Sequence, residues 1–299
     1  FVCLFLQQTI NLIFIGRTIP KIYRDDATDG IGITQLYINC TLLSIATGLV
    51  SGFETLGSNA FGVKNYYLLG LYYHRALIVS GSFIIVITMV HFFTAVPVLS
   101  LFSIDPTTMV YIEQYIRIYV FFVIFDVMFS LNFRYLNIIG KSYINFIILI
   151  FTIALHSLWC YIFIELLDLG ISGAGIALII SQALNAALTL GYIVFIKPIP
   201  ESVFWFNKDS FKGLVSYLKF SLPSAFLMCA EWWAFEIQAI VNLWISKNDY
   251  TAHVLIVNVM INTYTISLGY GCTMVVLVGK SISHSTIEKT KSYMKLIII

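Results

Sequence analysis

Charged residues are scarce in this chain of 299 residues, and this scarcity excludes an ordinary soluble protein. Asp, Glu, Lys and Arg together make up 11% of the sequence, whereas hydrophobic residues make up 59%. A soluble domain carries about 25% charged and 45–50% apolar residues. A water-exposed surface of normal polarity therefore cannot be built from this composition, and we predict an integral, multi-pass membrane protein.

The sequence also lacks the patterns that metal, redox and nucleic-acid sites require. The cysteines show no paired spacing of the kind that binds zinc or haem, and we predict small buried side chains. These residues are Cys3, Cys40, Cys160, Cys229 and Cys272. No basic cluster of the nucleic-acid type occurs, and we expect no metal and no cofactor. The first residue is not Met, and apolar runs begin and end the chain, so we interpret it as a fragment.

Apolar runs fill most of the sequence and predict an all-α fold, because a helix needs roughly 20 apolar residues to cross a bilayer. A polar stretch at 16–30 and a linker at 197–213, which contains two prolines, separate some of the runs. The expected spans are 1–15, which is incomplete, then 31–53, 66–96, 110–139, 143–166, 174–196, 214–245 and 252–278.

The positions of Lys and Arg predict the orientation of these spans. Twelve of the 17 basic residues lie near connections that follow even-numbered spans, and four follow odd-numbered spans. Since basic residues concentrate on the cytoplasmic side, we expect the even-numbered spans to end in the cytoplasm.

An internal repeat links the second and eighth spans. Asn39, Ser44 and Gly48 have the same spacing as Asn262, Ser267 and Gly271, with four residues and then three between them. Two parallel halves of six helices each are one known architecture of transporters. On this plan the chain holds one complete half and the first two helices of the next.

Two acids in the seventh span are the most informative polar residues. Glu231 and Glu236 lie within an apolar run, and no basic residue occurs between Lys219 and Lys247. A carboxyl group that is buried without a cation favours its neutral form, so it can exchange a proton for an organic cation. Trp232 and Trp233 precede Glu236 by four and three residues, where their rings could shield the carboxyl or stack on a cation.

Packing alone is the alternative interpretation of these acids, through hydrogen bonds between helices. Asn258, Asn262 and Tyr264 of the eighth span could line a cavity or join helices. Glu54 fits either a gate or a solvated helix end. For Asp126 we favour structural pairing, because Arg117 and Arg134 lie nine and eight residues away. His91 and His156 are isolated in apolar runs, and we expect structural roles.

Several segments resemble the eukaryotic multidrug and toxin extrusion (MATE) transporters. The segment 223–236, which contains Glu-Trp-Trp-Ala-Phe-Glu, resembles the signature of the family's seventh helix. The segment 52–62 is similar to the end of the family's second helix, Arg134-Tyr-Leu-Asn137 to the end of the fourth, and 169–177 to the start of the sixth. The resemblance runs along the whole chain.

The resemblance implies a MATE-type bundle of two six-helix lobes that exports organic cations or other amphipathic solutes against protons or sodium. It implies a complete six-helix N-lobe at 1–196, a cytoplasmic linker at 197–213 and the first two helices of a truncated C-lobe at 214–299. Proton coupling would rest on Glu231 and Glu236. Asn258 stands where animal relatives carry a third acid and where plant relatives tend to have Asn. Eukaryotic members mostly use protons, which favours protons over sodium. Asn11 stands where bacterial relatives carry a functional Asp, which argues against proton coupling in the first lobe and for the seventh span.

Departures from the family pattern leave other functions open. Asn59 and Asn137 replace family glutamines, and the helix-eight proline is missing near Ser267. We expect a monomeric antiporter for a small organic solute in the plasma or a vacuolar membrane, surrounded by lipid and without nucleic acid. The alternatives are a lipid or polysaccharide flippase with a similar architecture, or an inactive truncated protein. A membrane-embedded enzyme or receptor is disfavoured, because no catalytic constellation is visible.

Overall fold

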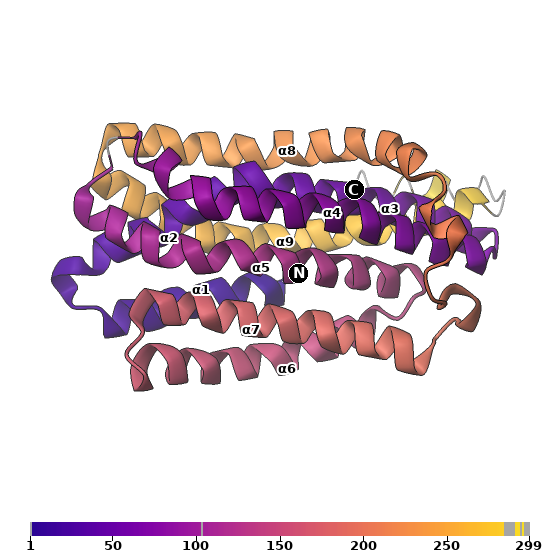
Figure 1. Ribbon diagram of the computed structural model, residues 1–299, viewed down its shortest axis with the longest axis horizontal. Coiled ribbons are helices and arrows are strands. Elements are labelled where there is room, and N and C mark those ends of the chain that lie inside the picture. Colours follow the sequence, from indigo (N-terminus) through magenta and orange to yellow (C-terminus); the bar gives the residue numbers. More distant parts are fainter. Residues whose placement is uncertain (1, 103, 284–290, 294, 296–299) are drawn as a thin grey trace.

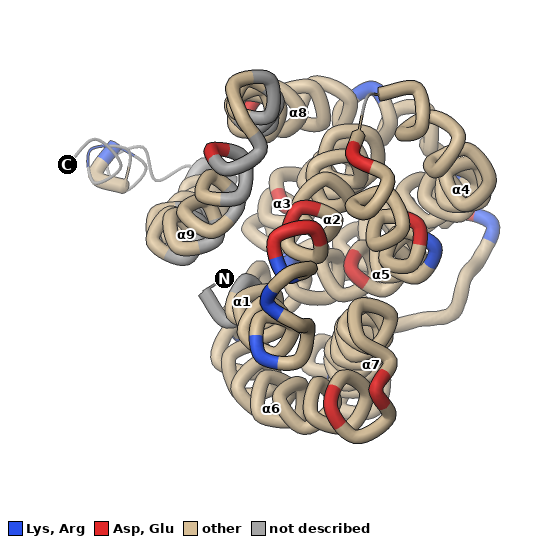
Figure 2. The backbone as a smooth tube through the Cα atoms, turned by 90° about the vertical axis from the view of Figure 1, so that its left-hand side faces the viewer, with Lys and Arg blue, Asp and Glu red and all other residues tan. Residues whose placement is uncertain are grey.

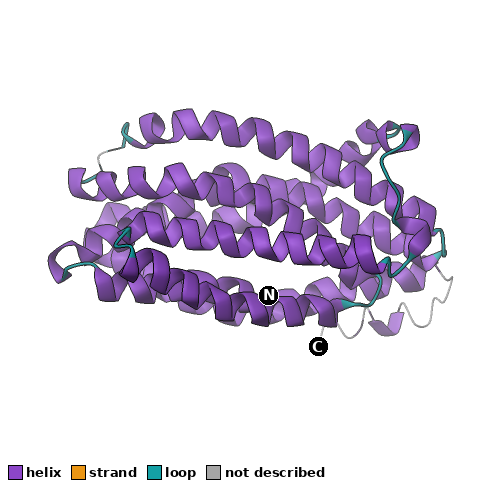
Figure 3. Cartoon of the chain, turned by 60° about the horizontal axis from the view of Figure 1, so that its bottom comes forward, coloured by secondary structure: helices purple, strands orange, loops and turns teal. Residues whose placement is uncertain are grey.

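The chain folds into an elongated bundle of long helices that run back and forth along one axis (Figure 1). The computed structural model describes residues 2–102, 104–283, 291–293 and 295, and within α8 and α9 some side chains lie outside the described part. Every regular element among the described residues is a helix, and short loops join the helices (Figure 3). The predicted all-α fold is confirmed.

The helices correspond to the spans expected from the apolar runs. They are α1 (Val2–Thr18), α2 (Arg24–Ile38), α3 (Ser44–Gly62), α4 (Tyr66–Leu99), α5 (Pro106–Ile138), α6 (Ser142–Cys160), α7 (Gly170–Gly191), α8 (Leu214–Ile245) and α9 (Lys247–Ser283). Among the described residues, five helical segments are long and apolar enough to cross a membrane. Charged residues occupy only a few short segments of the backbone in the end-on view, and uncharged residues make up most of the described helices (Figure 2).

Local sequence explains where several helices begin. Asn65 begins α4, and its side chain accepts a hydrogen bond of 3.0 Å from the Leu68 amide. Asp105 begins α5 by accepting from the Thr107 amide at 3.0 Å, and Pro106 follows at the first helical position. Such caps satisfy amides that have no partner within the helix. Asn65 and Asp105 therefore fix the starts of α4 and α5.

Two predicted boundaries are wrong. The second span was expected to begin at residue 31, but α2 begins at Arg24, inside the polar stretch 16–30. Asp25 and Asp26 lie in its first turn, where their charges favour the positive end of the helix dipole. The third span was expected to end at residue 96, yet α4 continues through Pro97 to Leu99.

Helices α2 and α3 form one continuous helix through a π-helical segment, Asn39–Leu43. At its end the Ser44 amide donates to the Asn39 carbonyl, five residues back, instead of to Cys40. The Cys40 carbonyl of this segment accepts hydrogen bonds from two side chains, at 2.9 Å from Trp233 Nε1 of α8 and at 3.3 Å from the Ser44 hydroxyl. A π-helical turn is a frequent feature of functional positions, and here it joins two segments that lie far apart in the sequence.

Small residues join α3 to α8 in an antiparallel register. A methyl group added to Gly48 would lie 2.3 Å from the Cα atom of Ala225, and one added to Gly52 would lie 2.6 Å from the Cβ atom of Ser221. One turn away, the Cys229 thiol lies 3.5 Å from the Ser44 hydroxyl. We call these contacts, together with that of Cys40 and Trp233, the α3–α8 seam.

The spacing of the α3–α8 seam explains its closeness. On each helix the seam residues recur at every fourth position, so they form one row along the helix surface. Small residues at this spacing let two backbones approach closely in a membrane, where hydrophobic association between helices is weak. The Tyr217 hydroxyl closes the seam by donating to the Leu49 carbonyl at 2.9 Å.

Replacing Gly48 with Ala tests whether the seam holds α3 and α8 together. The new methyl group cannot fit beside Ala225, so we expect a loss of about 1–3 kcal/mol of stability, as for other overpacked cores. Thermal unfolding of the purified protein in detergent measures it. Gly81→Ala in α4 is the matched control, because nothing lies within 4 Å of the added methyl group. Ala favours a helix over Gly, so this control should be neutral or stabilising. Equal melting temperatures for the two variants would contradict the seam.

Candidate functional site

The acid that the sequence singled out, Glu231, faces α9. Its carboxylate accepts a hydrogen bond from the Tyr264 hydroxyl of α9. The Tyr264 ring also contacts Phe235, with ring centroids 5.9 Å apart. Glu231 forms no ion pair with any described residue, in agreement with the absence of basic residues from this part of α8. The sequence had suggested a buried carboxyl, but the side chain is exposed on the described chain.

The tryptophans beside Glu231 lie on the side of α8 that contacts the first helices. Trp232 packs against the main hydrophobic core, and Trp233 donates to the Cys40 carbonyl of the π-helical segment. Successive residues are 100° apart around a helix, so Glu231 lies about 200° from Cys229 and Trp233 of the seam. One face of α8 therefore holds the N-terminal helices, and the opposite face presents the carboxylate.

Three residues that were expected to form the site have side chains outside the described part of the structure. They are Glu236, Asn258 and Asn262. Their roles stay predictions. Of the site residues proposed from the seventh and eighth spans, the structure brings together Glu231 and Tyr264, which are 33 positions apart in the sequence.

Glu54 is buried, so the alternative of a solvated helix end does not hold. Its Oε2 atom lies 3.5 Å from Nε of Arg134, and only 5% of the residue is exposed. Arg134 also donates to the Ser130 hydroxyl at 2.9 Å. The other carboxylate oxygen of Glu54 has no hydrogen-bond partner among the described residues. The pair joins α3 to α5 directly beneath the seam, close to Tyr217, whose phenol interacts electrostatically with Arg134.

Asp126 pairs differently from the expectation. Its carboxylate accepts a hydrogen bond of 2.7 Å from Gln182 of α7. Arg117, one of its expected partners, lies nearer the start of α5 and pairs with Glu113 at 2.7 Å. Arg134, the other, makes its ion pair with Glu54 and acts on Asp126 only electrostatically. Gln182 carries no local signal of this role in the sequence, because it lies 56 positions from Asp126.

Gln182 also belongs to a series of hydrogen-bonded polar side chains that connects α5, α7 and α6. Gln182 accepts from Asn185 at 3.0 Å, and Asn185 accepts from Thr152 of α6 at 2.7 Å. Gln182, Asn185 and Thr152 are almost fully buried. Each hydrogen bond therefore satisfies groups that would be costly to leave unpaired in an apolar interior.

Asn11 lies in a second buried cluster, where both ends of its amide are engaged. Its nitrogen donates to the Ala174 carbonyl at 3.1 Å, and its oxygen accepts from the Cys160 thiol at 3.1 Å. His156 contacts the same thiol and lies 2.9 Å from the Ser181 hydroxyl.

The histidines and cysteines of the apolar runs make structural contacts. His91 bridges the Ile87 carbonyl and the Thr41 hydroxyl. His156 likewise joins α6 to α1 and α7, so both histidines link helices, and their structural roles stay predictions. The three cysteines that are described, Cys40, Cys160 and Cys229, are free thiols.

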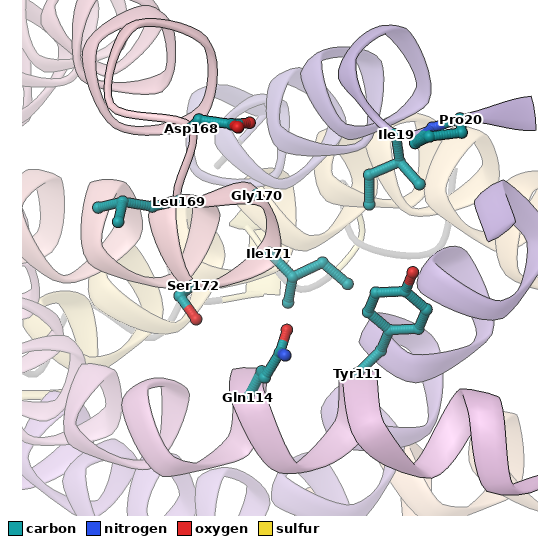
Figure 4. Close-up of a pocket in the computed structure, with 9 residues that line it drawn as sticks. All are labelled: Ile19, Pro20, Tyr111, Gln114, Asp168, Leu169, Gly170, Ile171 and Ser172. Atoms are coloured by element: carbon teal, nitrogen blue, oxygen red, sulfur yellow. The ribbon is translucent and has the colours of Figure 1, made fainter.

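A surface cavity of about 480 Å³ lies away from all of these residues. It is enclosed by the end of α1, the start of α5 and the turn before α7, at the end of the bundle opposite the linker. Tyr111 and Gln114 rise from α5 toward Ile171, and Asp168 lies at the rim (Figure 4). None of the residues that the sequence singled out as a site lines this cavity.

Known proteins show the same sequence pattern and the same fold. The sequence profile of the family described as MatE matches residues 1–162. Multidrug and toxin extrusion protein 1 of Xenopus tropicalis is 25% identical over 288 residues, which cover 96% of this chain and 49% of that protein. Its counterpart in Homo sapiens is 24% identical over 287 residues, with coverage of 96% and 49%.

The crystal structure of the eukaryotic MATE transporter AtDTX14 superposes with a TM-score of 0.86 at 19% identity, covering 98% of this chain and 64% of that one. A mutant of the Vibrio cholerae MATE transporter VcmN superposes with a TM-score of 0.72 at 17% identity, covering 98% and 65%. These likenesses show a shared fold.

The chain spans about half the length of the curated relatives that it matches. The profile match covers more than half of the chain, and the whole described bundle follows the MATE fold. The resemblance seen in the sequence is therefore confirmed: this integral membrane protein belongs to the multidrug and toxin extrusion (MATE) family.

Proposed function

We propose that this chain forms part of a secondary active transporter that exports organic cations or other amphipathic solutes in exchange for protons. The observation that carries the proposal is the hydrogen bond between Glu231 of α8 and Tyr264 of α9. Glu231 forms no ion pair with any described residue. An acid of this kind can hold either a proton or a cation. The relatives named above are multidrug and toxin extrusion proteins, and transport rather than enzymatic chemistry follows from the family.

Competition for one carboxylate would couple the two fluxes. Ionised Glu231 would bind the cationic solute, and protonation from outside the cell would release it. Loss of the proton toward the cytoplasm would then restore the binding site. The Tyr264 hydroxyl positions the carboxylate by donating a hydrogen bond to it from α9. Glu236 is proposed as the second acid on the basis of the family resemblance.

Protons are favoured over sodium as the coupling ion. Asn11 stands where bacterial relatives carry a functional Asp, and its amide is engaged by Ala174 and Cys160. A neutral amide in a closed set of hydrogen bonds supplies no negative charge for a metal ion. Coupling is therefore assigned to α8.

Movement of two lobes would alternate access to the site. We propose an N-lobe at 1–196, a linker at 197–213 and the start of a C-lobe at 214–299, as the sequence suggested. In this arrangement the α3–α8 seam is the contact between lobes, and it would have to separate in each transport cycle.

A flippase for lipids or polysaccharides is the weaker candidate. Such a protein would need unpaired cations facing a large cavity to bind phosphate or acidic sugars. Arg117 and Arg134, the cations inside the fourth expected span, pair with Glu113 and Glu54. We therefore retain the exporter of organic cations.

Replacing Glu231 with Gln in the complete transporter tests the proposal. The amide cannot bind or release a proton, so efflux of a fluorescent organic cation driven by a pH gradient should fall to the level of empty vesicles. Glu113→Gln is the matched control: it makes the same substitution at an exposed ion pair, and such pairs contribute little. Undiminished exchange by Glu231→Gln would refute proton coupling at this residue.

Replacing Tyr264 with Phe tests the hydrogen bond to the carboxylate. Its loss removes the contact that positions the carboxylate, so the protein should bind the cation more weakly. We expect the dissociation constant of the cation to rise about fivefold, the effect of losing about 1 kcal/mol from one hydrogen bond. Titration with a fluorescent cation at fixed pH measures this change. An unchanged or lower dissociation constant would contradict the assigned contact.

A cross-link tests whether the seam must open. In a Ser44→Cys variant the new thiol faces Cys229, because the native hydroxyl is 3.5 Å from that sulfur. Oxidation should form a disulfide and stop transport, and a reductant should restore it. The same variant with Cys229→Ser cannot form this bond and should be insensitive to the oxidant. Full transport by cross-linked protein, with the disulfide verified by peptide mapping, would show that the lobes do not separate here.

A further inference from the structure

The segment between α7 and α8 is fixed to the bundle rather than hanging as a free linker. Residues 203–207 run in an extended conformation along the beginning of α4. Phe204 stacks on Tyr67 with ring centroids 4.9 Å apart, and Phe206 stacks on His74 at 4.4 Å. Gly70 makes room for this approach, because an added methyl group would lie 2.4 Å from the Ser202 carbonyl oxygen.

Hydrogen bonds fix both sides of this segment. The buried His74 ring lies 2.9 Å from the Ser210 hydroxyl, and Ser210 forms a reciprocal capping box with Asn207. The Tyr135 hydroxyl of α5 lies 2.5 Å from the Ser202 hydroxyl. The segment is therefore held in place by α4 and α5, and its outer face is a fixed surface.

That outer face is apolar and aromatic. Side chains alternate along an extended chain, so Trp205 points away from α4 while Phe204 and Phe206 point toward it. Trp205 is 89% exposed, the highest value among the large apolar side chains that are described. Phe211 and Val215 continue the exposed surface toward α8, at 59% and 66%.

The charge of the same segment is positive. Residues 197–219 contain four lysines and two acids. Asp209 is already neutralised: Lys212 binds it at 2.8 Å, and this hydrogen bond and charge hold the pKa of the carboxyl below its usual range. Lys197 and Lys208 are exposed and form no ion pair with any described residue. Both therefore remain available to an external anion.

We infer that the 197–219 segment is a binding surface for anionic phospholipid, with the Trp205 ring at the level of the headgroups and Lys197 and Lys208 against their negative charges. The surface is continuous with α7 and α8, so it lies at the boundary of the bilayer. Tryptophan is enriched at this boundary, and each lysine near an anionic membrane surface adds about 1 kcal/mol of attraction. The distribution of basic residues along the chain places this end on the cytoplasmic side, where anionic lipids are concentrated.

This inference is tested by measuring how much lipid stays bound to a variant that lacks the charges of Lys197 and Lys208. The chain is purified from nanodiscs of phosphatidylcholine with phosphatidylserine, washed with detergent, and its bound lipids are counted by native mass spectrometry. A Lys197→Gln/Lys208→Gln variant should retain about thirtyfold less phosphatidylserine, the effect of losing roughly 1 kcal/mol of attraction at each of the two lysines, and an unchanged amount of phosphatidylcholine. The difference should shrink as salt is raised, because screening weakens exposed charge interactions.

Arg17→Gln/Lys21→Gln is the matched control, since it removes two exposed positive charges from the opposite end of the bundle. It should retain phosphatidylserine like the unaltered protein. Trp205→Ala should weaken retention of both lipids, because it removes the aromatic contact and no charge. Equal loss from the two charge-deleted variants, or no loss from Lys197→Gln/Lys208→Gln, would overturn the inference. This outcome is independent of the transport proposal, because no cation flux is measured.

Discussion

Helices α3 and α8 come so close at Gly48 and Gly52 that no side chain larger than hydrogen fits at those points. Helices in lipid are not driven together by the hydrophobic effect, so close van der Waals contact and polar bonds must hold them. The seam supplies both: small residues on each helix, and hydrogen bonds from Trp233 and Tyr217 to α3 and its π-helical extension. Because one face of α8 is occupied in this way, Glu231 is directed toward α9.

The π-helical segment is part of the same constraint. Its last backbone hydrogen bond runs from the Ser44 amide to the Asn39 carbonyl, and its Cys40 carbonyl accepts a hydrogen bond from Trp233 of α8. The two tryptophans of α8 therefore have structural contacts of their own. Trp232 packs against the hydrophobic core, and Trp233 binds α8 to the π-helical segment.

The polar groups of the bundle form two sets: a structural set that is buried in contacts between helices, and an available set that is exposed. The Asp126 chain, the Asn11 cluster and the two histidines are engaged in hydrogen bonds between helices. Glu54 and Arg134 pair more loosely, with one carboxylate oxygen left without a described partner. Since an ion pair buried in a membrane interior is costly to break, this pair fixes α3 against α5 beneath the seam. Glu231, bound by a single phenol and by no cation that is described, belongs to the available set.

The sequence alone determined the membrane class, the all-α fold, the positions of the helices and the family. These follow from composition and local runs, because apolar length and backbone hydrogen bonding leave few choices in lipid. It also identified Glu231 and Tyr264 as separate candidates. Only the tertiary structure decided that these two meet, that Asp126 binds Gln182 rather than an arginine, and that residues 197–213 are docked on α4. Residues 44, 48 and 52, and 221, 225 and 229, carried the signal of the seam as small residues at every fourth position. The pairing of the two rows, however, depends on the register between helices, which no local pattern specifies.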